Sequence, residues 1–504
     1  MVPIDANDLR GLLAFVHSYG HLYETLNVEF FSARVFERID AEWLSFLCRL
    51  DSAQLNMVPV EFEQYPDCPA SLKHFFASAR RFSLLDKYST PFVDQQHNNK
   101  YSSPEQLRKV KRKKAHELGA FSELLRAKCA PLGIDRVVDI GCGLGHLGRV
   151  LRLNNNESLQ QQQTSNDNNI SLLLDYVGIE ANPALCHSAR QNDLKMENIV
   201  FGSGTGLDDG SSSSSEQYRN ILTLPGCRTA IVSLHGCGEL QRQILLEFVA
   251  MCKQQTAEHP KLLVTVGCCY HKLSDWNDSA IERWMLSSQM RDLFLHTFGH
   301  NHFPIPGLRL ACQATLVRWM AFTEQQHTAH RQAFANRAFV ECLRMHKKTA
   351  ATKAKSANDV FYRHSSNSTN CEKVDDNDHN GGGDLLQMHQ RRPPRKLNKC
   401  VLANNNLDEF RSEVMRRSAI VEEERDEFEQ TLDQIMDTYS PAVRFIEPFT
   451  ALQFALQCPL ESLVLLDRLL FLRENGIGGA ELVRLFDPAI SPRCVAIVAR
   501  VNEQ

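Results

Sequence analysis

The segment VVDIGCGLGHLGRVL, residues 137–151, decides the fold. An apolar run ends near Asp139, glycines follow at Gly141, Gly143 and Gly145, and a helix-like apolar segment comes next. Glycines at this spacing let the backbone adopt positive φ angles and approach a ligand closely at the carboxyl end of a strand. The first turn of the helix adds the positive end of its dipole. The segment therefore predicts a strand, a ligand-binding turn and a helix.

Two kinds of cofactor could use such a loop. Gly143, Gly145 and Gly148 can be framed as a dinucleotide fingerprint, but the first glycine of that pattern should directly follow the strand, and here that residue is Gly141. Asp139 lies two residues before Gly141, where its carboxylate would repel a pyrophosphate but attract the ammonium group of S-adenosyl-L-methionine. We therefore predict a methyl-donor loop whose cofactor-binding residues are Asp139, Gly141, Cys142, Gly143 and Gly145.

A second acid fits the same cofactor. An acid that binds ribose hydroxyls is expected roughly 20 residues after the loop, at the end of the second strand. Glu180 lies 35 residues after Gly145, and removing the 16-residue polar insert 154–169 leaves 19. YVGIE thus becomes the second strand and Glu180 a cofactor-binding residue. Without a cofactor, the same residues would form only a glycine turn and an acid at a strand end.

Short apolar runs alternate with helix-sized segments along the middle of the chain. They are RVVDIG (136–141), LLLDYVGIE (172–180), TAIVSLHG (229–236) and KLLVTVGCCY (261–270). Runs of this kind are typical of parallel strands that are buried on both faces. The pattern predicts a doubly wound α/β fold with a mostly parallel sheet.

The rest of the chain is expected to surround or interrupt this core. Polar stretches 154–169 and 202–216 lack the apolar residues of a core and are predicted to be mobile loops. We expect a helical N-terminal cap at 1–103, a core with the first five strands at 104–272, a helical insertion at 273–455 with a disordered part at 350–405, and a final helix and strand hairpin at 456–504 that complete the sheet.

Composition limits the function classes. Of 504 residues, 43% are hydrophobic and 23% charged, as in ordinary globular proteins. The net charge of −4 excludes a polycation, so any nucleic-acid contact needs a local basic patch. Sixteen cysteines are too few for a disulfide scaffold, which favours a reducing compartment. With no signal peptide or uncharged membrane-spanning run expected, we predict a soluble protein of the cytoplasm, the nucleus or both.

Chemically active side chains follow the last two of the four apolar runs, in SLHGCGEL and VGCCYHKL, which we take as the fourth and fifth of the five expected strands. His235 or His271 could act as a general base. Alternatively, both histidines with Cys237, Cys268 and Cys269 could bind a metal, or the cysteines could pack as small buried hydrophobes. The spacing is not a zinc-finger pattern, so we assign no metal ligands. We favour a functional His235, since it follows a strand that should face the cofactor.

An absent motif narrows the substrate. Enzymes that methylate exocyclic base amines typically carry a proline-containing motif ending in an aromatic residue after the fourth strand. Residues 233–236 are Ser-Leu-His-Gly and contain neither proline nor an aromatic residue. Methylation of a base amine is therefore disfavoured.

A basic segment precedes the glycine loop. LRKVKRKKAHE (107–117) carries six Lys or Arg between Arg108 and Lys114. It could bind RNA phosphates near the active site, or it could be a solvated helix face. The cluster RRPPRK (391–396) is a more generic basic signal.

Together these segments resemble the methyltransferase-like protein 25 group, which is related to ribosomal RNA adenine dimethylase domain-containing protein 1. The resemblance rests on KKAHE (113–117), the glycine loop, YVGIEAN (176–182), SLHGCGEL and VGCCYHKL, and extends to VEFFSARVFERIDAEWL and to LVRLFDPAISPRCVAIVAR. It implies a Rossmann-like class I methyltransferase fold with a seven-stranded sheet, and a methyltransferase that depends on S-adenosyl-L-methionine.

The LHxCG and CCYH elements also look like those of eukaryotic tRNA 2′-O-methyltransferases. This similarity favours an RNA substrate, rRNA or tRNA, with a ribose 2′-hydroxyl as one acceptor. Protein methylation and a non-catalytic adaptor remain alternatives. The implied catalytic residues are His235 and His271, and the implied substrate residues are Cys269, Tyr270, Lys113 and Lys114. One departure is WMLSS (284–288), where the family usually shows a Phe-Pro-Met/Leu-Ser-like segment.

Overall fold

The computed structural model describes residues 3–92, 110–152, 174–192, 199–201, 222, 226–254, 259–274, 279–364, 407–417 and 425–501. The predicted mobile loops at 154–169 and 202–216 and the basic cluster at 391–396 lie outside these residues. The chain divides into two compact units. We call Met1–Tyr19, Ala77–Trp319 and Phe454–Gln504 the sheet unit, and Gly20–Phe76 and Met320–Gln453 the helical unit.

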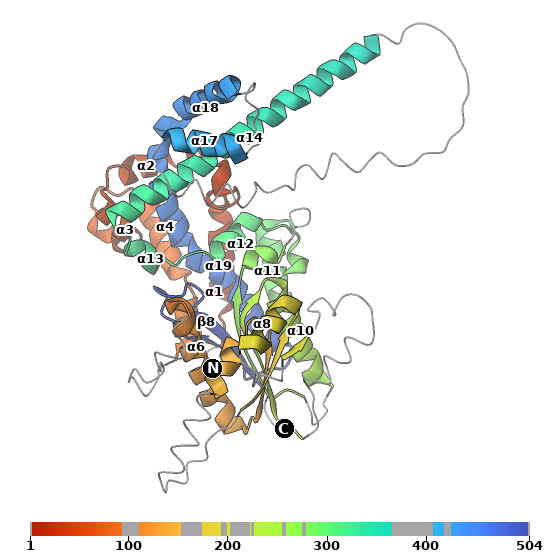
Figure 1. The fold of residues 1–504 in the computed structure, drawn as a ribbon. Coiled ribbons are helices and arrows are strands. Elements are labelled where there is room, and N and C mark those ends of the chain that lie inside the picture. The colour runs from red at the N-terminus through yellow and green to blue at the C-terminus, as the bar shows by residue number, and fades with distance from the viewer. Residues whose placement is uncertain are drawn as a thin grey trace, which may run out of the picture. The chain divides into compact units, whose positions relative to one another are not determined.

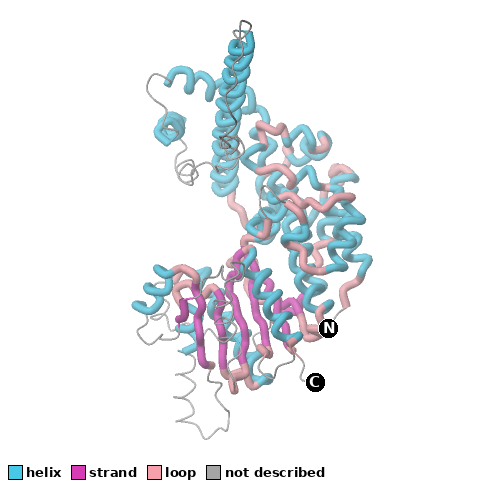
Figure 2. The backbone as a smooth tube through the Cα atoms, turned by 90° about the vertical axis from the view of Figure 1, so that its right-hand side faces the viewer, coloured by secondary structure: helices cyan, strands magenta, loops and turns pink. Residues whose placement is uncertain are grey.

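The sheet unit is built on one sheet, whose strands lie side by side in Figure 2. The strand order is β1-β7-β8-β6-β5-β2-β3-β4. All neighbours are parallel except for β8, which runs antiparallel to both β6 and β7. The strands are β1 (Ser89–Pro91), β2 (Arg136–Ile140), β3 (Asp175–Glu180), β4 (Ile199–Phe201), β5 (Thr229–Cys237), β6 (Leu262–Cys268), β7 (Glu481–Arg484) and β8 (Val495–Arg500).

This architecture confirms the predicted mostly parallel α/β sheet. β2 to β8 are the seven strands of the Rossmann-like core, with β7 and β8 supplied by the C-terminal hairpin as expected. β1 adds an eighth, short strand beside β7 that the sequence did not indicate. Three residues that include a proline carry no strand pattern of their own.

Apolar residues cover both faces of the central strands. Val232 of β5 and Val264 of β6 pack in one cluster with Leu118 and Phe121 of α6 (Arg112–Cys129). The opposite face holds Thr265, which hydrogen-bonds to a side chain of α10 (Glu239–Lys253). Because successive strand residues point to opposite faces, strands covered by helices on both sides become almost continuously apolar.

The remaining helices of the sheet unit lie around this core (Figure 1). They include α1 (Ala6–Ser18), α5 (Leu85–Tyr88), α8 (Pro183–Asn192), α11 (Ser288–Phe298) and α12 (Ile305–Ala311). A further helix over residues 146–152 follows the glycine loop. α4 (Ala70–Arg81), α13 (Leu316–Met320) and α19 (Ile446–Glu474) each cross a boundary between the two units.

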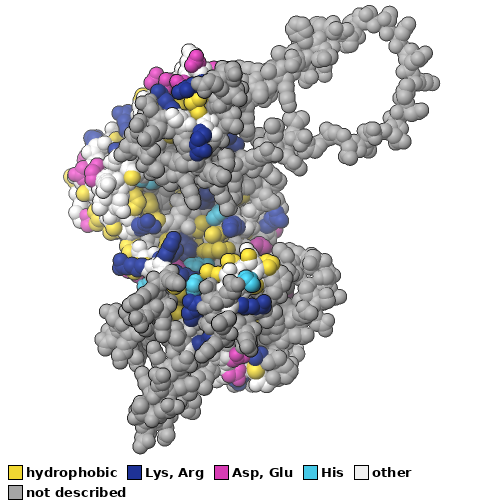
Figure 3. All heavy atoms as spheres, viewed as in Figure 1, with side chains coloured by type: hydrophobic (Ala, Val, Ile, Leu, Met, Phe, Trp, Pro, Cys, Tyr) yellow, Lys and Arg dark blue, Asp and Glu magenta, His cyan; other side chains and the backbone are white. Residues whose placement is uncertain are grey.

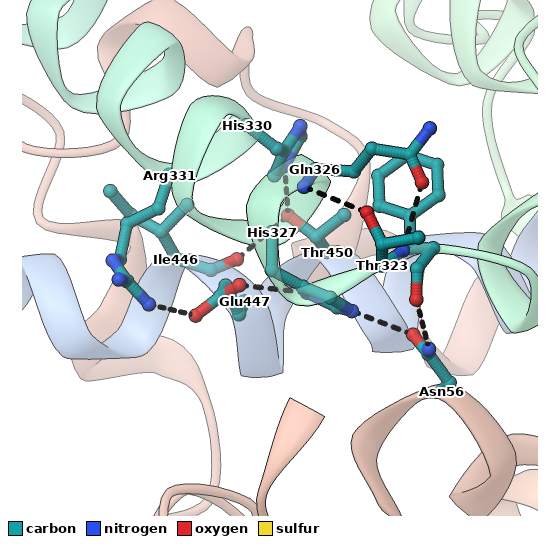
Figure 4. A network of polar contacts seen from close by, with 10 residues as sticks. Asn56, Thr323, Gln326, His327, His330, Arg331, Ile446, Glu447 and Thr450 are labelled. Atoms are coloured by element: carbon teal, nitrogen blue, oxygen red, sulfur yellow. Dashed lines mark hydrogen bonds and ion pairs between the residues drawn. The ribbon is translucent and has the colours of Figure 1, made fainter. Parts of the chain in front are cut away.

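The helical unit contains α2 (Ala41–Leu47), α3 (Ser52–Glu61), α14 (Glu324–His364), α17 (Leu407–Arg417) and α18 (Arg425–Tyr439). A buried polar network links its segments, as Figure 4 shows. His327, which is fully buried, lies 2.8 Å from a carboxylate oxygen of Glu447 and 2.7 Å from the side-chain oxygen of Asn56. The Asn56 amide nitrogen donates to the Phe322 carbonyl, which orients its oxygen toward His327. Three distant chain segments are thereby joined.

The division into units differs from the predicted domain boundaries. Residues 279–319, which we expected in the helical insertion, belong to the sheet unit. The N-terminal cap is also divided, since 20–76 lie in the helical unit but 3–19 and 77–92 in the sheet unit. Residues 350–364, which we expected to be disordered, are helical, because α14 continues to His364. Residues 365–406 lie outside the described residues.

Within the described residues, one helical stretch, Arg425–Glu474, is long and apolar enough to cross a membrane. In this structure 89% of its most apolar window is buried inside the protein. Core helices pass the same test, so the length of this stretch indicates a core element as readily as a membrane span.

Candidate active site

The glycine loop has the backbone conformation that its glycines allow. Gly141, Gly143 and Gly145 have φ angles of +76°, +58° and +69°, in the left-handed region where other residues are strained. The backbone N–H groups of Gly141 and Cys142 donate to the Ile179 carbonyl, which ties the loop to β3. A Cβ atom built on Gly143 would meet no atom within 4 Å. The loop is thus open at Gly143, where a ligand could lie against the backbone.

Glu180 lies at the end of β3 and against this loop. One of its carboxylate oxygens accepts a hydrogen bond of 2.9 Å from the Gly143 N–H, and the other accepts one of 2.9 Å from the Asn182 N–H. The side chain remains partly exposed. The acid that the spacing assigned to ribose binding is therefore next to the open part of the loop.

The side chain of Cys142, within the loop, packs against β3. A Cβ atom on Gly178 of β3 would lie 2.8 Å from the Cys142 sulfur, which is closer than real contacts allow. Gly178 therefore leaves the space that the Cys142 side chain fills. Burial raises the pKa of the Cys142 thiol, so this sulfur stays protonated. Its side chain is a packing group that lies between the glycine loop and β3.

Asp139 lies in β2, two residues before the first glycine of the loop. Its side chain is buried, with 3% exposed, and one oxygen accepts a 2.7 Å hydrogen bond from the Tyr176 hydroxyl. Within the described part of the chain it makes no hydrogen bond to the loop N–H groups. Burial raises the pKa of Asp139 to about 6, although the Tyr176 hydroxyl and the charge of Lys114 oppose that rise. Its charge therefore changes close to neutral pH.

His235 is held by an unusual backbone and a buried carboxylate. It is one of three non-glycine residues with positive φ in the described structure, at +75°, and the pairing of β5 with β6 shifts register between Leu234 and Gly236. The shift turns the ring away from its strand position. Its Nε2 atom lies 2.9 Å from a carboxylate oxygen of Glu117, and 24% of the side chain is exposed.

Glu117 is a site residue that the sequence analysis did not assign, although it ends the KKAHE motif. It projects from α6 and is almost completely buried. Burial alone would raise its pKa, but hydrogen bonds from His235 and Ser491 and the charge of Lys113 outweigh that effect and lower the pKa to about 2. The carboxylate is thus ionised and can only accept. The proton of a neutral His235 ring must then reside on Nε2, which leaves Nδ1 as the basic atom.

The predicted substrate lysines lie at the start of the same helix. Lys113 is about half exposed, and its amine lies 3.6 Å from Glu117. Lys114 is more enclosed, and burial lowers its pKa against the charges of Glu117, Asp139 and Cys268. The charge of Lys114 therefore acts both on Asp139, next to the glycine loop, and on Cys268, at the end of β6.

Two predicted residues have other neighbours. Tyr270 is 2% exposed, and its hydroxyl donates to a carboxylate oxygen of Glu461 on α19. It is a core residue in this structure, and its contact with substrate stays a prediction. The Nδ1 atom of His271 lies 3.3 Å from the Cys312 sulfur at the end of α12. The structure therefore joins His235, but not His271, to the buried Glu117.

Three thiols meet beyond the ends of β5 and β6. The sulfur atoms of Cys237, Cys268 and Cys269 all lie within 4.8 Å of one another. The Cys237 and Cys268 sulfurs are 2.8 Å apart. A hydrogen bond from Cys268 lowers the pKa of Cys237 to about 6, and the same interaction raises that of Cys268. Cys237 is thus the most acidic thiol of the group.

The WMLSS segment, 284–288, is held in the sheet unit by buried contacts. Trp284 is fully buried, and the N–H groups of Leu286 and Ser287 donate to the buried carboxylate of Asp467. Asp467 also pairs with Arg468, whose guanidinium lies 5.9 Å from the Trp284 ring centroid. This segment fixes the start of α11 against α19.

Comparison with known proteins agrees with this geometry. The model of a methyltransferase domain family matches residues 111–276, which contain α6, the glycine loop and the ends of β5 and β6. The chain is 24% identical over 295 residues to the probable methyltransferase-like protein 25 of Mus musculus, covering 57% of this chain and 40% of that protein. The corresponding protein of Homo sapiens is 25% identical over 296 residues, covering 58% and 40%. No solved structure matches the chain.

The match thus spans well under half the length of these curated relatives. The domain model covers KKAHE, the glycine loop, YVGIEAN, SLHGCGEL and VGCCYHKL, on which the predicted resemblance rests. The chain contains a methyltransferase domain and is similar, at the level of the family, to methyltransferase-like protein 25.

Proposed function

We propose that this protein is a methyltransferase that depends on S-adenosyl-L-methionine. The observation that carries the proposal is the glycine loop. It has three glycines with left-handed backbone and is open at Gly143, where the N–H group donates a hydrogen bond to Glu180. A partly exposed carboxylate beside open backbone suits a ribose with two hydroxyl donors. These residues therefore fit the cofactor. Gly141 to Gly145 and Glu180 would hold it, and Asp139 and Lys114 would set the charge beneath the glycine loop.

When bound, the cofactor supplies a methyl group on a positively charged sulfur. The residues of this chain supply position and a base. Glu117 holds the proton on Nε2 of His235, so Nδ1 would take the proton that an acceptor hydroxyl or amine loses as it bonds to the methyl carbon and the bond from that carbon to the cofactor sulfur breaks. The imidazolium that results is stabilised by the Glu117 carboxylate, as in other carboxylate–histidine pairs.

We further propose that the acceptor is an RNA, with a ribose 2′-hydroxyl as one acceptor atom. The start of α6 supports this substrate, because Lys111, Arg112 and Lys113 are exposed there, one to two helical turns before Glu117. In Figure 3, Lys, Arg and His side chains lie among hydrophobic ones on the face where α6 and α8 lie in Figure 1. Arg108 and Lys109 of the predicted basic segment lie outside the described residues. An intracellular location in cytoplasm or nucleus suits such a substrate.

Calorimetric titration tests the cofactor. The full chain should bind S-adenosyl-L-methionine and its demethylated product saturably, and Gly143→Arg should abolish binding. Gly299→Arg is a matched control, because Gly299 also has positive φ (+69°) and open space within 4 Å of where a Cβ would lie, but ends α11. Loss of binding in both variants, or no binding by the folded wild type, would contradict the proposal.

Transfer of a labelled methyl group tests the substrate. Total cellular RNA and total protein should be incubated separately with the enzyme, and label should appear in RNA. Charge reversal of Lys111 and Arg112 should weaken labelling of RNA while cofactor binding is kept. Labelling of protein alone would replace the RNA proposal by protein methylation, and cofactor binding without any transfer would favour a non-catalytic adaptor.

A further inference from the structure

We propose that Cys237, Cys268 and Cys269 bind one zinc ion beyond the carboxyl ends of β5 and β6. This site is separate from the glycine loop, and it does not depend on whether a methyl donor binds. No metal ligands could be assigned from the spacing of these cysteines along the chain. What carries the proposal is the convergence of the three sulfur atoms in the fold.

The backbone brings the three thiols to one place. Cys237 and Cys268 are direct partners in the parallel pairing of β5 and β6. Cys269 follows Cys268 in the chain, and in a regular strand its side chain would point to the opposite face. Its φ and ψ of +53° and +45° lie in the left-handed region and end the strand. The turn at Cys269 lets two consecutive thiols reach the same point.

Further contacts hold this arrangement. The Gly238 N–H donates to the Cys268 carbonyl at 2.9 Å, just beyond the paired cysteines. Gly238 itself has a φ of +56°, and a Cβ there would lie 2.6 Å from the Cβ of Lys272. The tip of β5 can therefore approach the turn after β6 only with glycine at this position. The thiols are preorganised by backbone on both strands.

The sulfur separations suit a soft metal ion. Zinc–sulfur bonds of about 2.3 Å in a tetrahedron place sulfur atoms about 3.8 Å apart. The three sulfurs lie within 4.8 Å of one another. A small rotation of the side chains would therefore place all three at the same distance from one central point. The Cys237–Cys268 separation of 2.8 Å is shorter, and a bound ion would widen it by about 1 Å. Thiolates favour zinc over magnesium or calcium.

A fourth position remains for a ligand from solution. Within the described residues, the group of mutually close ligand atoms contains these three cysteines and no fourth His, Asp or Glu. Three protein ligands and one exchangeable position are typical of reactive zinc sites, whereas structural sites usually have four protein ligands. The carboxyl ends of the strands are also where ligands enter this fold.

Nearby cations complement the charge of such a site. Three thiolates and one zinc ion carry a net negative charge, which would be costly next to further acids. The lysine charges that act on the cluster come from Lys272, which acts on Cys237, and from Lys114, which acts on Cys268. These positive groups compensate the excess charge without providing ligand atoms that displace a thiolate.

Metal analysis of the full chain tests the site. Protein purified in reductant without chelator should contain one zinc per chain, and metal-free protein should regain one equivalent from zinc sulfate. Cobalt(II) in place of zinc should give the charge-transfer absorption of metal thiolates. Cys237→Ser, Cys268→Ser and Cys269→Ser should each lose the equivalent. Cys252→Ser, which changes a half-buried cysteine on α10, should retain it.

Several results would overturn the proposal. They are a folded, reduced wild type that takes up no zinc or cobalt, metal retained by Cys237→Ser, or metal lost equally in Cys252→Ser. Should the serine variants fail to fold, the cobalt absorption of the wild type decides alone, and its absence contradicts the site. Calorimetry with the methyl donor is measured separately, so failure of the proposed function would leave the zinc result interpretable.

Discussion

The ring of His235 shows how a single residue can be given a chemical role by its surroundings. A left-handed backbone and a shift in strand register aim the ring at Glu117, and the ionised carboxylate determines which nitrogen keeps the proton. Neither feature is visible from the residue type, because His in a strand is equally compatible with a packed core position. The chemistry follows from the pair rather than from the histidine alone.

Replacement of His235 tests that role. His235→Ala should lower the rate of methyl transfer by about 100- to 10,000-fold, the usual contribution of a general base. Affinity for the methyl donor should stay nearly unchanged, because the ring of His235 is hydrogen-bonded to Glu117 on α6. His187→Ala, an exposed histidine on α8, is the control and should leave the rate unchanged. Full activity of His235→Ala with cofactor bound would exclude it as the base.

Asp139 should make donor binding depend on pH. Because burial raises its pKa to about 6, the carboxyl is mostly neutral at pH 5 and ionised at pH 7. The ionised form attracts the positively charged donor, so affinity for the donor should increase as the pH rises from 5 to 7 and then level off.

The stability of the ligand-free protein should depend on pH with the opposite sign. A carboxyl whose pKa is raised from its usual 3.8 to about 6 lowers stability as the pH rises from about 3.8 to about 6.

Calorimetry at several pH values measures this effect. Asp139→Asn removes the titrating group and should give weaker binding that no longer changes between pH 5 and 7. The groups that face Asp139 are the Tyr176 hydroxyl, Lys114 and, through its charge, Glu180. A wild-type affinity that is flat across this range would show that Asp139 stays in one protonation state.

At the scale of elements, the contact between β3 and the glycine loop depends on Gly178. A methyl group there would lie 2.8 Å from the Cys142 sulfur, so Gly178→Ala should push the loop outward. Overpacking of this kind costs about 1–3 kcal/mol, and donor affinity should fall with it. Cys142→Ala in the same chain removes the sulfur and should restore part of the loss. A double-mutant cycle without coupling would argue against this contact.

The start of α11 should depend on one buried acid. Asp467 accepts from the N–H groups of Leu286 and Ser287 and pairs with the buried Arg468. Asp467→Ala leaves Arg468 without its partner carboxylate and should destabilise the sheet unit by about 3–5 kcal/mol, measured by denaturant unfolding. Asp67→Ala breaks an exposed pair with Arg49 and should cost less than about 1 kcal/mol. Equal effects would contradict a special role for Asp467.

Strands were predicted better than the contacts between distant elements. Val-rich runs located β2, β3, β5 and β6, because parallel strands are buried on both faces and are apolar throughout. The three-residue β1 had no such run, and Glu117 looked like any acid on a helix with an apolar face. The pairing of Glu117 with His235 and the convergence of three thiols depend on left-handed backbone at His235 and Cys269, which local patterns do not reveal.

For the molecule as a whole, the two units should respond differently to acid. His330, in the helical unit, contacts the Thr450 hydroxyl, and burial and the nearby Arg337 lower its pKa to about 4. A histidine with a lowered folded-state pKa destabilises the fold as pH falls below about 6.5, since only the unfolded chain takes up the proton. Asp139 acts in the opposite direction in the sheet unit.

Hydrogen exchange at pH 7 and pH 5, corrected for intrinsic rates, separates these effects. Protection of α14 should decrease at pH 5 more than protection of β2 and β5. The charges around His330 also include Glu447, which favours its protonation, and His327. His330→Gln should reduce the difference between the units. An equal loss of protection in both units would show that other groups dominate.

The position of β8 has a consequence for how this chain is made on the ribosome. β8 lies between β6 and β7, yet it is separated from β6 by more than two hundred residues, including most of the helical unit. Until β8 has been synthesised, the free edge of β6 has nothing to pair with and can pair with another chain. Such long sequence separation also slows folding. The nascent protein should therefore need chaperones until the last strand emerges, and premature termination before Val495 should yield aggregates rather than a smaller soluble domain.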